Sequence, residues 1–354
     1  MKIPRIAIID DGINLDYIPQ GIPFEHYEVY EGVVKLAVAS KDSTHGTACY
    51  YMFCNYFKSK HHLVSIKVLD DELRTGSRNT LLAALNWCVR KNIDLIHMSI
   101  GTRQYLDFEP ISEVIKKLQK TIIVAACSNR NIITFPACLP TVIGVRHCNI
   151  EELKGKFAYI STPHDQIEMI TYSESCSNSM AAPIISAHVC NYLAQGYSGL
   201  KVVRQKLKED AVQDTSFLSY SFYKGLLSEW EELQVPVVAI PDDILDMSKG
   251  LEKLKFLIKA FVQDGYRAIC LSTTLETNVE ALLFQITWQE EQVSLPDLIK
   301  LYYNFTMPDI IFLHMDIQQA FSNPGSMKPD VVITEDMLKL DTENLFGKIK
   351  GLLS

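Results

Sequence analysis

Three short segments of the chain carry an acid, a base and a nucleophile. Asp10 lies in IAIIDDG, His45 in THGTACYYMF and Ser179 in SNSMAAP. A serine hydroxyl is a weak nucleophile by itself, and it needs an adjacent base that a third group orients. An aspartate, a histidine and a serine can fill these roles in the hydrolysis of an acyl bond. These side chains can act together only if the fold brings distant parts of the chain to one place.

The pattern of residues 1–213 predicts an α/β fold, a parallel sheet with helices on both faces, because apolar β-branched runs alternate with helix-like segments. The expected strands are 5–10, 62–70, 93–100, 121–127 and 141–145, and the expected helices are 45–57, 76–91, 108–120 and one that begins near Ser179. Asp10 would then stand at the carboxyl end of a strand, where ligands of such sheets bind. Ser179 would stand at a helix N-terminus, whose free N–H groups suit an oxyanion-bearing adduct.

The three motifs resemble the signatures of the subtilisin-like serine proteases, the subtilase family. That family has Asp-Ser/Thr-Gly, His-Gly-Thr and Gly-Thr-Ser-Met-Ala-Ala/Ser-Pro, in the order Asp, His, Ser. Here they stand as Asp10-Asp11-Gly12, His45-Gly46-Thr47 and Ser177-Asn178-Ser179-Met180-Ala181-Ala182-Pro183. DLIHMSIG (94–101), VAACSN (124–129) and FPACLPTVIGV (135–145) are similar to further segments of the family, in the right order. Six ordered matches make this resemblance specific.

The resemblance implies a role for each matched residue. Ser179 would attack the scissile carbonyl, His45 would take its proton, and Asp10 would orient the imidazole. Asn129 and the Ser179 N–H would bind the oxyanion. The substrate-binding walls would comprise Ser99, Ile100, Gly101, Ala125, Ala126 and Cys127. The resemblance implies no cofactor, and since no calcium-binding loop is evident, we expect no metal.

Four residues depart from the family pattern. Asp11 stands where the family has Ser or Thr, and an ionised carboxylate near His45 should raise the pKa of that histidine. Ser128 replaces a glycine before Asn129, and Ser177 with Asn178 replaces Gly-Thr before Ser179. Lost glycines restrict close backbone approach. The alternative is therefore a catalytically weak or inactive subtilase-like scaffold that binds a peptide or a maturation enzyme.

Residues 235–354 predict a second, smaller α/β domain after a linker or docking segment at 214–234. Its expected strands are 235–240, 266–273, 308–316 and 329–334, and its expected helices are 248–263, 278–288 and 341–353. It resembles a P-loop-like fold with a Walker-B-like Asp316, but the phosphate loop GxxxxGK[ST] is absent. The acids Asp242, Asp243 and Asp246 stand where phosphate would need donors. We expect a binding role, with nucleotide regulation as an open alternative.

Composition and charge exclude several classes of protein. The net charge is −8, and the acidic excess lies in the second half, which argues against nucleic-acid binding. No 18-residue apolar run suggests a membrane span. The nine cysteines are odd in number and include no CxxC, and no signal-peptide pattern is seen. Together these features predict reduced thiols in a cytoplasmic protein.

The sequence as a whole predicts a cytoplasmic serine endopeptidase that processes a specific peptide. Its architecture resembles peptidases of bacterial systems that modify ribosomally made peptides and remove the leader. This resemblance makes a leader peptide or a peptide-modifying enzyme the expected partner of the second domain. A peptide or protein is the expected substrate.

Overall fold

The computed structural model describes residues 2–39, 41–70, 75–161, 163–227, 229–244, 249–286, 293–316 and 328–353. The chain divides into two compact units, Met1–Arg103 with Asp107–Phe217 and Gln104–Leu106 with Leu218–Ser354. Residues 218–234, expected as a linker, group with the second unit. Each unit is built around its own sheet.

The sheet of the first unit has nine strands among the described residues, in the order β3-β2-β4-β1-β5-β6-β7-β9-β8. Its pairs are parallel except for the two edge pairs, β2 with β3 and β8 with β9. The strands are β1 (Arg5–Asp10), β2 (Phe24–Tyr30), β3 (Val33–Leu36), β4 (His62–Lys67), β5 (Leu95–Met98), β6 (Ile122–Ala126), β7 (Ile143–His147), β8 (Phe157–Tyr159) and β9 (Met169–Thr171).

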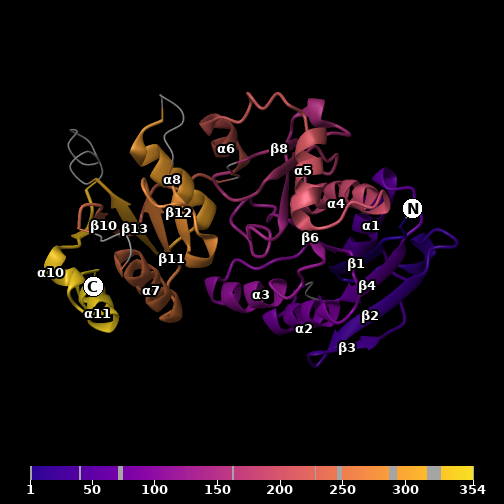
Figure 1. Ribbon diagram of the computed structural model, residues 1–354, viewed down its shortest axis with the longest axis horizontal. Helices are drawn as coiled ribbons and strands as arrows, with labels where there is room; N and C mark the ends of the chain where they lie inside the picture. The colour runs from indigo at the N-terminus through magenta and orange to yellow at the C-terminus, as the bar shows by residue number, and fades with distance from the viewer. Residues whose placement is uncertain are drawn as a thin grey trace. The chain divides into compact units, whose positions relative to one another are not determined.

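Helices cover both faces of this sheet, as the sequence predicts. Figure 1 shows α2 and α3 together on one side and α1, α4 and α5 on the other. The helices are α1 (His45–Tyr56), α2 (Arg78–Val89), α3 (Phe108–Ile115), α4 (Asn178–Ala194) and α5 (Leu200–Asp210), with 3-10 turns η1 (Leu15–Tyr17), η2 (Tyr105–Asp107) and η3 (Glu151–Leu153). The predicted α/β class with a parallel sheet is confirmed.

Helix α4 is packed into the core of the first unit. Strands covered on both faces are apolar along their whole length, and β1, β5, β6 and β7 are buried almost throughout. Helix α4 packs on β5, β6 and β7 and against α1. Ala181, Ala182 and Ala187 are fully buried, and these small side chains allow close packing of the helix on the sheet. The N-terminus of α4 is thereby held over the carboxyl edge of the sheet.

The second unit has a five-stranded parallel sheet among its described residues, in the order β12-β11-β13-β10-β14. Its strands are β10 (Val237–Pro241), β11 (Ala268–Ser272), β12 (Leu283–Gln285), β13 (Ile310–Met315) and β14 (Val331–Val332). Its helices are α6 (Tyr220–Leu226), α7 (Lys249–Gln263), α8 (Leu295–Thr306), α10 (Glu335–Leu338) and α11 (Thr342–Leu353), with a 3-10 turn η4 (Val279–Ala281).

One predicted helix, 278–288, is wrong over its described part, residues 278–286. The segment holds η4 and β12 instead. Asn278 caps the short turn by accepting from the Ala281 N–H, and Leu282 then takes a positive φ of 53°, which ends the turn. Apolar runs this short fit either a strand or a helix, so pattern alone did not separate the two. The β2–β3 hairpin and α8 were not predicted.

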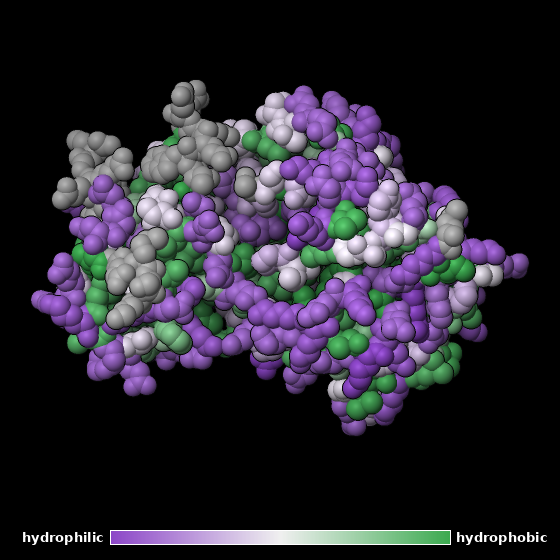
Figure 2. All heavy atoms as spheres, viewed as in Figure 1, coloured by the Kyte–Doolittle hydropathy of each residue, from purple (hydrophilic) through white to green (hydrophobic). Residues whose placement is uncertain are grey.

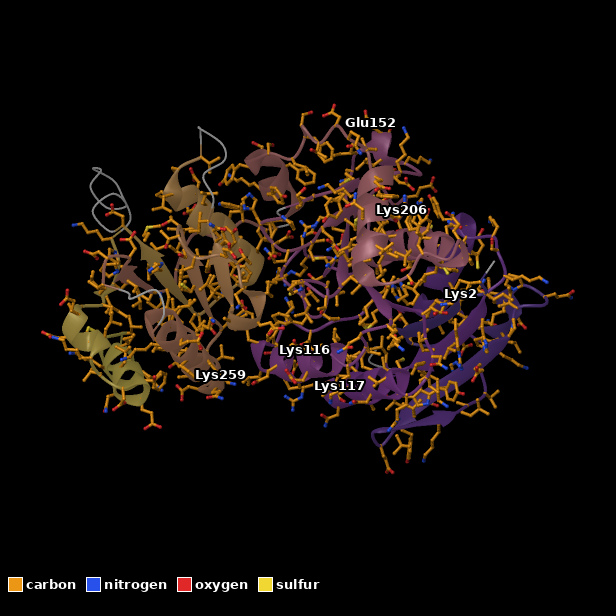
Figure 3. All side chains as sticks on the ribbon, in the orientation of Figure 1. Lys2, Lys116, Lys117, Glu152, Lys206 and Lys259 are labelled. Atoms are coloured by element: carbon orange, nitrogen blue, oxygen red, sulfur yellow. The ribbon has the colours of Figure 1, made fainter. Side chains whose placement is uncertain are left out.

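Several lysines lie on the surface. Lys2, Lys116 and Lys259 are exposed and are labelled in Figure 3. The face drawn in Figure 2 is mainly hydrophilic, with apolar residues scattered across it. Within the described residues, no helix combines the length and the apolar character that crossing a membrane requires.

Candidate active site

The first carboxylate of the site ends the central strand. Asp10 is the last residue of β1 and only 1% exposed. Its Oδ1 accepts a hydrogen bond from the Asp11 N–H at 2.9 Å. The chain then turns through Gly12, whose φ of 102° is strained for any residue with a side chain. The carboxylate is therefore held at the carboxyl edge of the sheet, where a parallel fold places its ligands.

The second carboxylate, Asp11, caps helix α1. Its Oδ2 accepts from the His45 N–H at 2.9 Å and its Oδ1 from the Gly46 N–H at 2.7 Å. An anion is stabilised at a helix N-terminus, where N–H groups lack partners within the helix. Asp11, which stands where the family has Ser or Thr, thus links the end of β1 to the start of α1 through two hydrogen bonds.

Gly46 allows α1 to approach β1. A Cβ at this position would lie 2.4 Å from the Gly12 carbonyl oxygen and 3.1 Å from Asp10 Cβ. Thr44, the N-cap of α1, also donates from Oγ1 to the Gly12 oxygen at 2.7 Å. The His-Gly pair of the motif therefore has a steric reason, since the helix start lies directly against the loop after Asp10.

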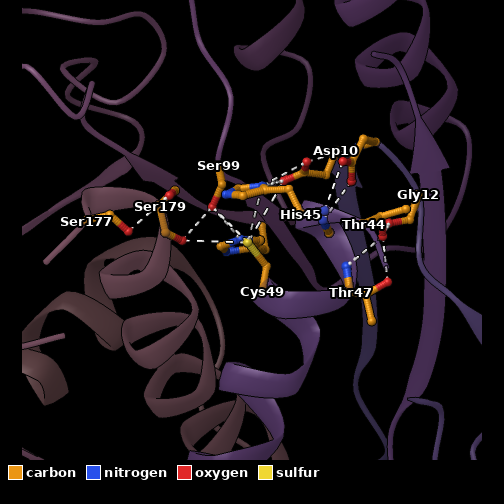
Figure 4. A network of polar contacts seen from close by, with 12 residues as sticks. Asp10, Gly12, Thr44, His45, Thr47, Cys49, Ser99, Ser177 and Ser179 are labelled. Carbon is orange, nitrogen blue, oxygen red and sulfur yellow. Dashed lines mark hydrogen bonds and ion pairs between the residues drawn. The ribbon is translucent and has the colours of Figure 1, made fainter. Parts of the chain in front are cut away.

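His45 faces Asp10 across this contact. Its Nδ1 lies 3.1 Å from Asp10 Oδ1 and 3.0 Å from Oδ2 (Figure 4). The hydrogen bond to Asp10 raises the pKa of His45, a second contact with Cys49 adds to this, and burial opposes both. Burial is the main cause that raises the pKa of Asp10, and the charge of Asp11 raises it further. The causes that raise the pKa of His45 are its contacts with Asp10 and Cys49, whereas the sequence pointed to Asp11.

Ser179 is the second residue of α4 and is 8% exposed. Its carbonyl oxygen would normally accept a hydrogen bond from the N–H four residues later, but residue 183 is a proline and has none. Ser99 Oγ donates to this oxygen at 2.9 Å, and Cys49 Sγ lies 3.6 Å from it. Because Pro183 has no N–H, the Ser179 carbonyl is free to contact Ser99, which follows β5, and Cys49 of α1.

A row of serine hydroxyls leads to the candidate nucleophile. Ser173, Ser175, Ser177 and Ser179 alternate along the chain, and successive Oγ atoms lie 2.9, 3.2 and 3.4 Å apart. Ser177 is the N-cap of α4 but does not cap it with its side chain. Among the described residues, the hydrogen bond of the Ser179 hydroxyl goes to Ser177, and none joins it to His45.

Asn129 lies beside the backbone of the candidate nucleophile. Its Oδ1 accepts from the Asn178 N–H at 2.9 Å and from the Ser179 N–H at 3.4 Å. An oxyanion would need the Asn129 Nδ2 and the Ser179 N–H as donors. In this arrangement the side-chain oxygen occupies that place, so the amide must turn before both donors face a substrate.

Asn178 joins three segments around the site. Its Oδ1 accepts from the His147 N–H at 2.7 Å, at the end of β7. Its Nδ2 donates to the Ser128 carbonyl at 2.5 Å and to Asn131 Oδ1 at 2.9 Å. The residue is buried, and its side chain is fully engaged. Asn178, which stands where the family has Thr, therefore holds the 128–131 loop against α4.

The expected substrate walls differ in exposure. Ile100 is half-buried and Gly101 exposed, whereas Ala125, Ala126 and Cys127 are buried. Gly101 is required by a close approach, because a Cβ there would lie 2.7 Å from the Phe135 carbonyl oxygen. Cys127 Sγ donates to the Ile132 carbonyl at 3.6 Å. Of the six expected wall residues, Ser99, Ile100 and Gly101 are the ones that are not buried.

Sequence reasoning missed His97 and Cys49 and gave Ser99 a different role. His97 Nε2 lies 3.0 Å from Ser99 Oγ, and its Nδ1 lies 2.9 Å from Ser186 Oγ on α4. Burial lowers the pKa of His97 to about 3, so this imidazole is neutral. A polar residue in a buried parallel strand could have signalled such a contact, because buried polar groups need partners.

The acids of the second unit gather at one end of its sheet. Asp242, Asp243 and Asp316 line a cavity of about 540 Å³ at the carboxyl ends of β10 and β13. Asp246, the remaining acid singled out from the sequence, lies outside the described residues. Three carboxylates therefore face this cavity.

One curated protein and several solved structures resemble the chain. No protein-family model matches the chain. It is similar to the minor extracellular protease Epr of Bacillus subtilis (strain 168), with 24% identity over 212 residues, a match that covers 54% of this chain and 29% of that protein. The chain therefore spans less than a third of the length of this curated relative.

Three solved structures are similar over the larger part of the chain. A lanthipeptide protease has 14% identity and a TM-score of 0.47, over 60% of this chain and 82% of that one. A cold-adapted subtilisin-like serine proteinase has 20% identity and a TM-score of 0.42, over 60% and 85%. The prenylagaramide maturation protease PagA has 19% identity and a TM-score of 0.38, over 55% and 78%. Each of these similar proteins is a protease by its description, and one of them is described as subtilisin-like.

Proposed function

We propose that the chain is a subtilisin-like serine endopeptidase that cleaves peptide bonds through an acyl-enzyme, with Asp10, His45 and Ser179 as its catalytic residues. The observation that carries this proposal is the placement of His45 Nδ1 within 3.1 Å of both oxygens of the buried Asp10. Such a carboxylate keeps the proton on Nδ1 and leaves Nε2 free to act as a base. The sequence similarity to proteases supports the same reaction.

In this mechanism Ser179 Oγ bonds to the scissile carbonyl carbon while its proton passes to His45 Nε2. The collapse of the tetrahedral intermediate breaks the C–N bond, and His45 returns the proton to the leaving amine. Water then repeats the sequence on the ester. Before attack, the Ser179 hydroxyl must leave Ser177 and the Asn129 amide must turn its Nδ2 toward the oxyanion. Both changes are side-chain rotations.

The same two contacts favour a second candidate function. A scaffold without catalytic activity would keep the Ser179 hydroxyl on Ser177 and the Asn129 oxygen on the backbone N–H groups. Such a chain would bind a peptide or a maturation enzyme without cleaving it. The two candidates differ in whether Ser179 is chemically activated.

A fluorophosphonate probe distinguishes them, because it reacts with activated serines. We expect the native protein to gain the mass of one adduct and Ser179→Ala to gain none. Ser112→Ala, which changes a buried serine of α3 in the same unit, is the matched control and should still be labelled. A folded native protein that gains no adduct would favour the scaffold.

The substrate that we propose is a specific peptide, such as a ribosomally made precursor from which a leader is removed. We propose that the second unit recognises the leader or a modifying enzyme. All nine cysteines are free thiols, which supports a reducing compartment, and we propose the cytoplasm.

Processing assays test this finer role. The rate constant kcat/KM for a leader-bearing precursor should exceed that for the same cleavage site without the leader. The double variant Asp242→Asn, Asp316→Asn should reduce this preference while fluorophosphonate labelling stays unchanged. Equal rates for the two peptides would refute the leader role and leave the peptidase proposal standing.

A further inference from the structure

A buried thiol that the proposed mechanism does not use lies against the base. Cys49 follows His45 by four residues on α1, so the two side chains share one face of the helix. Its Sγ lies 3.8 Å from His45 Nδ1 and 4.0 Å from Asp10 Oδ2. Figure 4 shows the sulfur between the imidazole and the backbone of Ser179. A sulfur, a nitrogen and a carboxylate oxygen thus lie within reach of one ion.

These separations are close to those around a tetrahedral zinc ion. Bonds of about 2.3 Å to sulfur and about 2.0 Å to nitrogen and oxygen place the N and O ligands about 3.3 Å apart and S about 3.5 Å from each. The corresponding distances here are 3.0 Å from N to O, 3.8 Å from N to S and 4.0 Å from O to S. Shifts of a few tenths of an ångström would close the triangle on a metal.

We propose that Asp10, His45 and Cys49 form an inhibitory site for a thiophilic divalent cation such as Zn²⁺. The ligand set is a carboxylate, a neutral imidazole and a thiolate, so a divalent ion and these three ligands together have no net charge. This matters because Asp10 and Cys49 are buried, and an unbalanced charge there would be costly. The His45 side chain is 33% exposed, and solvent on that side supplies the fourth ligand.

Binding at Nδ1 removes the base from the proposed reaction. The Cys49 thiol gives its proton to solvent as the S–metal bond forms. Nδ1 also releases its proton to solvent as the N–metal bond forms, and Nε2 takes up one proton from solvent, so the ring stays neutral. The neutral ring then carries its one proton on Nε2, the atom that would have to accept the proton of Ser179. The metal therefore inhibits by fixing the wrong tautomer and by taking the carboxylate of Asp10.

Titration of the full chain with Co²⁺ tests the site itself. A tetrahedral Co²⁺ ion with one thiolate ligand should give visible ligand-field bands and a sulfur-to-cobalt charge-transfer band. Cys49→Ala should weaken binding by more than the roughly 10–100-fold loss caused by removing an outer partner. Cys176→Ala removes an exposed thiol and is the matched control. Equal bands in Cys49→Ala and the native protein, or no bands in either, would overturn the site.

The labelling rate in the presence of Zn²⁺ tests the inhibition. The inhibition rests on the proposed function, whereas the existence of the metal site does not depend on it. Each variant's fluorophosphonate labelling rate with Zn²⁺ is divided by its own rate without metal. The ratio should fall at least tenfold for the native protein and for Cys176→Ala, and stay near one for Cys49→Ala. An equal fall in Cys49→Ala would refute inhibition through this site. Cobalt bands that depend on Cys49 in a protein that is never labelled would uphold the site and refute the peptidase.

Discussion

Ser99 Oγ donates a hydrogen bond to the carbonyl oxygen of Ser179 at 2.9 Å. This bond takes the place of the helical bond that Pro183 cannot donate, and His97 holds Ser99 from the other side at 3.0 Å. The contact joins the residue after β5 to the first turn of α4. It therefore fixes the backbone from which the proposed nucleophile extends.

Ser99→Ala should destabilise the first unit and slow the reaction. The change leaves His97 Nε2 without its hydroxyl partner, at a cost of about 1–3 kcal/mol, and leaves the Ser179 carbonyl with only the weaker Cys49 thiol contact. The free energy of unfolding in urea and the fluorophosphonate labelling rate measure the two effects. Ser175→Ala, at an exposed serine, is the control and should change stability little. A fully stable Ser99→Ala would contradict the role assigned to this bond.

Ser177→Ala should speed labelling of Ser179. The hydrogen bond between the two hydroxyls, 3.4 Å long, must break before His45 can take the proton. Since a net hydrogen bond is worth about 0.5–1.5 kcal/mol, the rate should rise roughly two- to tenfold. Ser175→Ala leaves the Ser177–Ser179 contact in place and should react at the native rate. A slower Ser177→Ala would mean that Ser177 assists the reaction instead.

Asn178→Asp should disrupt the loop that carries Asn129. The carboxylate keeps the bond from the His147 N–H but loses both donations from Nδ2, to Ser128 and Asn131. We expect a fall in stability of about 3 kcal/mol, with slower labelling of Ser179.

Asn304→Asp is the matched control for this change. Asn304 is a buried asparagine of the second unit whose Nδ2 also donates to two carbonyl oxygens. Its substitution should lower stability while the labelling rate of the folded protein is unchanged. Equal effects of the two substitutions on labelling would remove the special role of Asn178.

Gly46→Ala and Gly347→Ala should act in opposite directions. The added methyl group at Gly46 would meet the Gly12 oxygen at 2.4 Å, so α1 must move away from Asp10. Such overpacking typically costs about 1–3 kcal/mol, and labelling should fall with it. At Gly347, in α11, nothing lies within 4 Å, and alanine should stabilise the helix by up to about 1 kcal/mol. Thermal unfolding measures whether each substitution raises or lowers the stability.

Asp10→Asn should lower activity and shift its pH dependence. Losing the oriented tautomer should reduce kcat by roughly 10⁴-fold, the loss known for this change in another Asp-His-Ser hydrolase. The bond to Asp10 raises the pKa of His45, so the rate should fall as pH drops through that raised value, where the base becomes protonated. Without the carboxylate the pKa of His45 falls, and the acid limb of kcat/KM should move to lower pH. An acid limb at the native pH would exclude this coupling.

Local patterns in the sequence were enough to predict the class of the fold and to single out the residues proposed for catalysis. Strands 5–10 and 121–127 and helix 45–57 were predictable because burial on both faces and helical periodicity are local patterns. Asp10 at a strand end and Ser179 at a helix start followed from the same patterns. His61, by contrast, is buried and lies 2.9 Å from the Tyr50 hydroxyl, a contact that no local pattern indicates.

The contacts between distant segments became visible in the folded structure and not in the sequence. Cys49 meets the Ser179 carbonyl across 130 positions, and Asn129 meets the Ser179 N–H across 50. The tertiary structure also turned Asp11 toward the N–H groups of α1 instead of the imidazole of His45. Such contacts depend on how α1, α4 and the loops pack on one sheet edge. Sequence spacing does not encode separations of a few ångströms between groups that far apart in the chain.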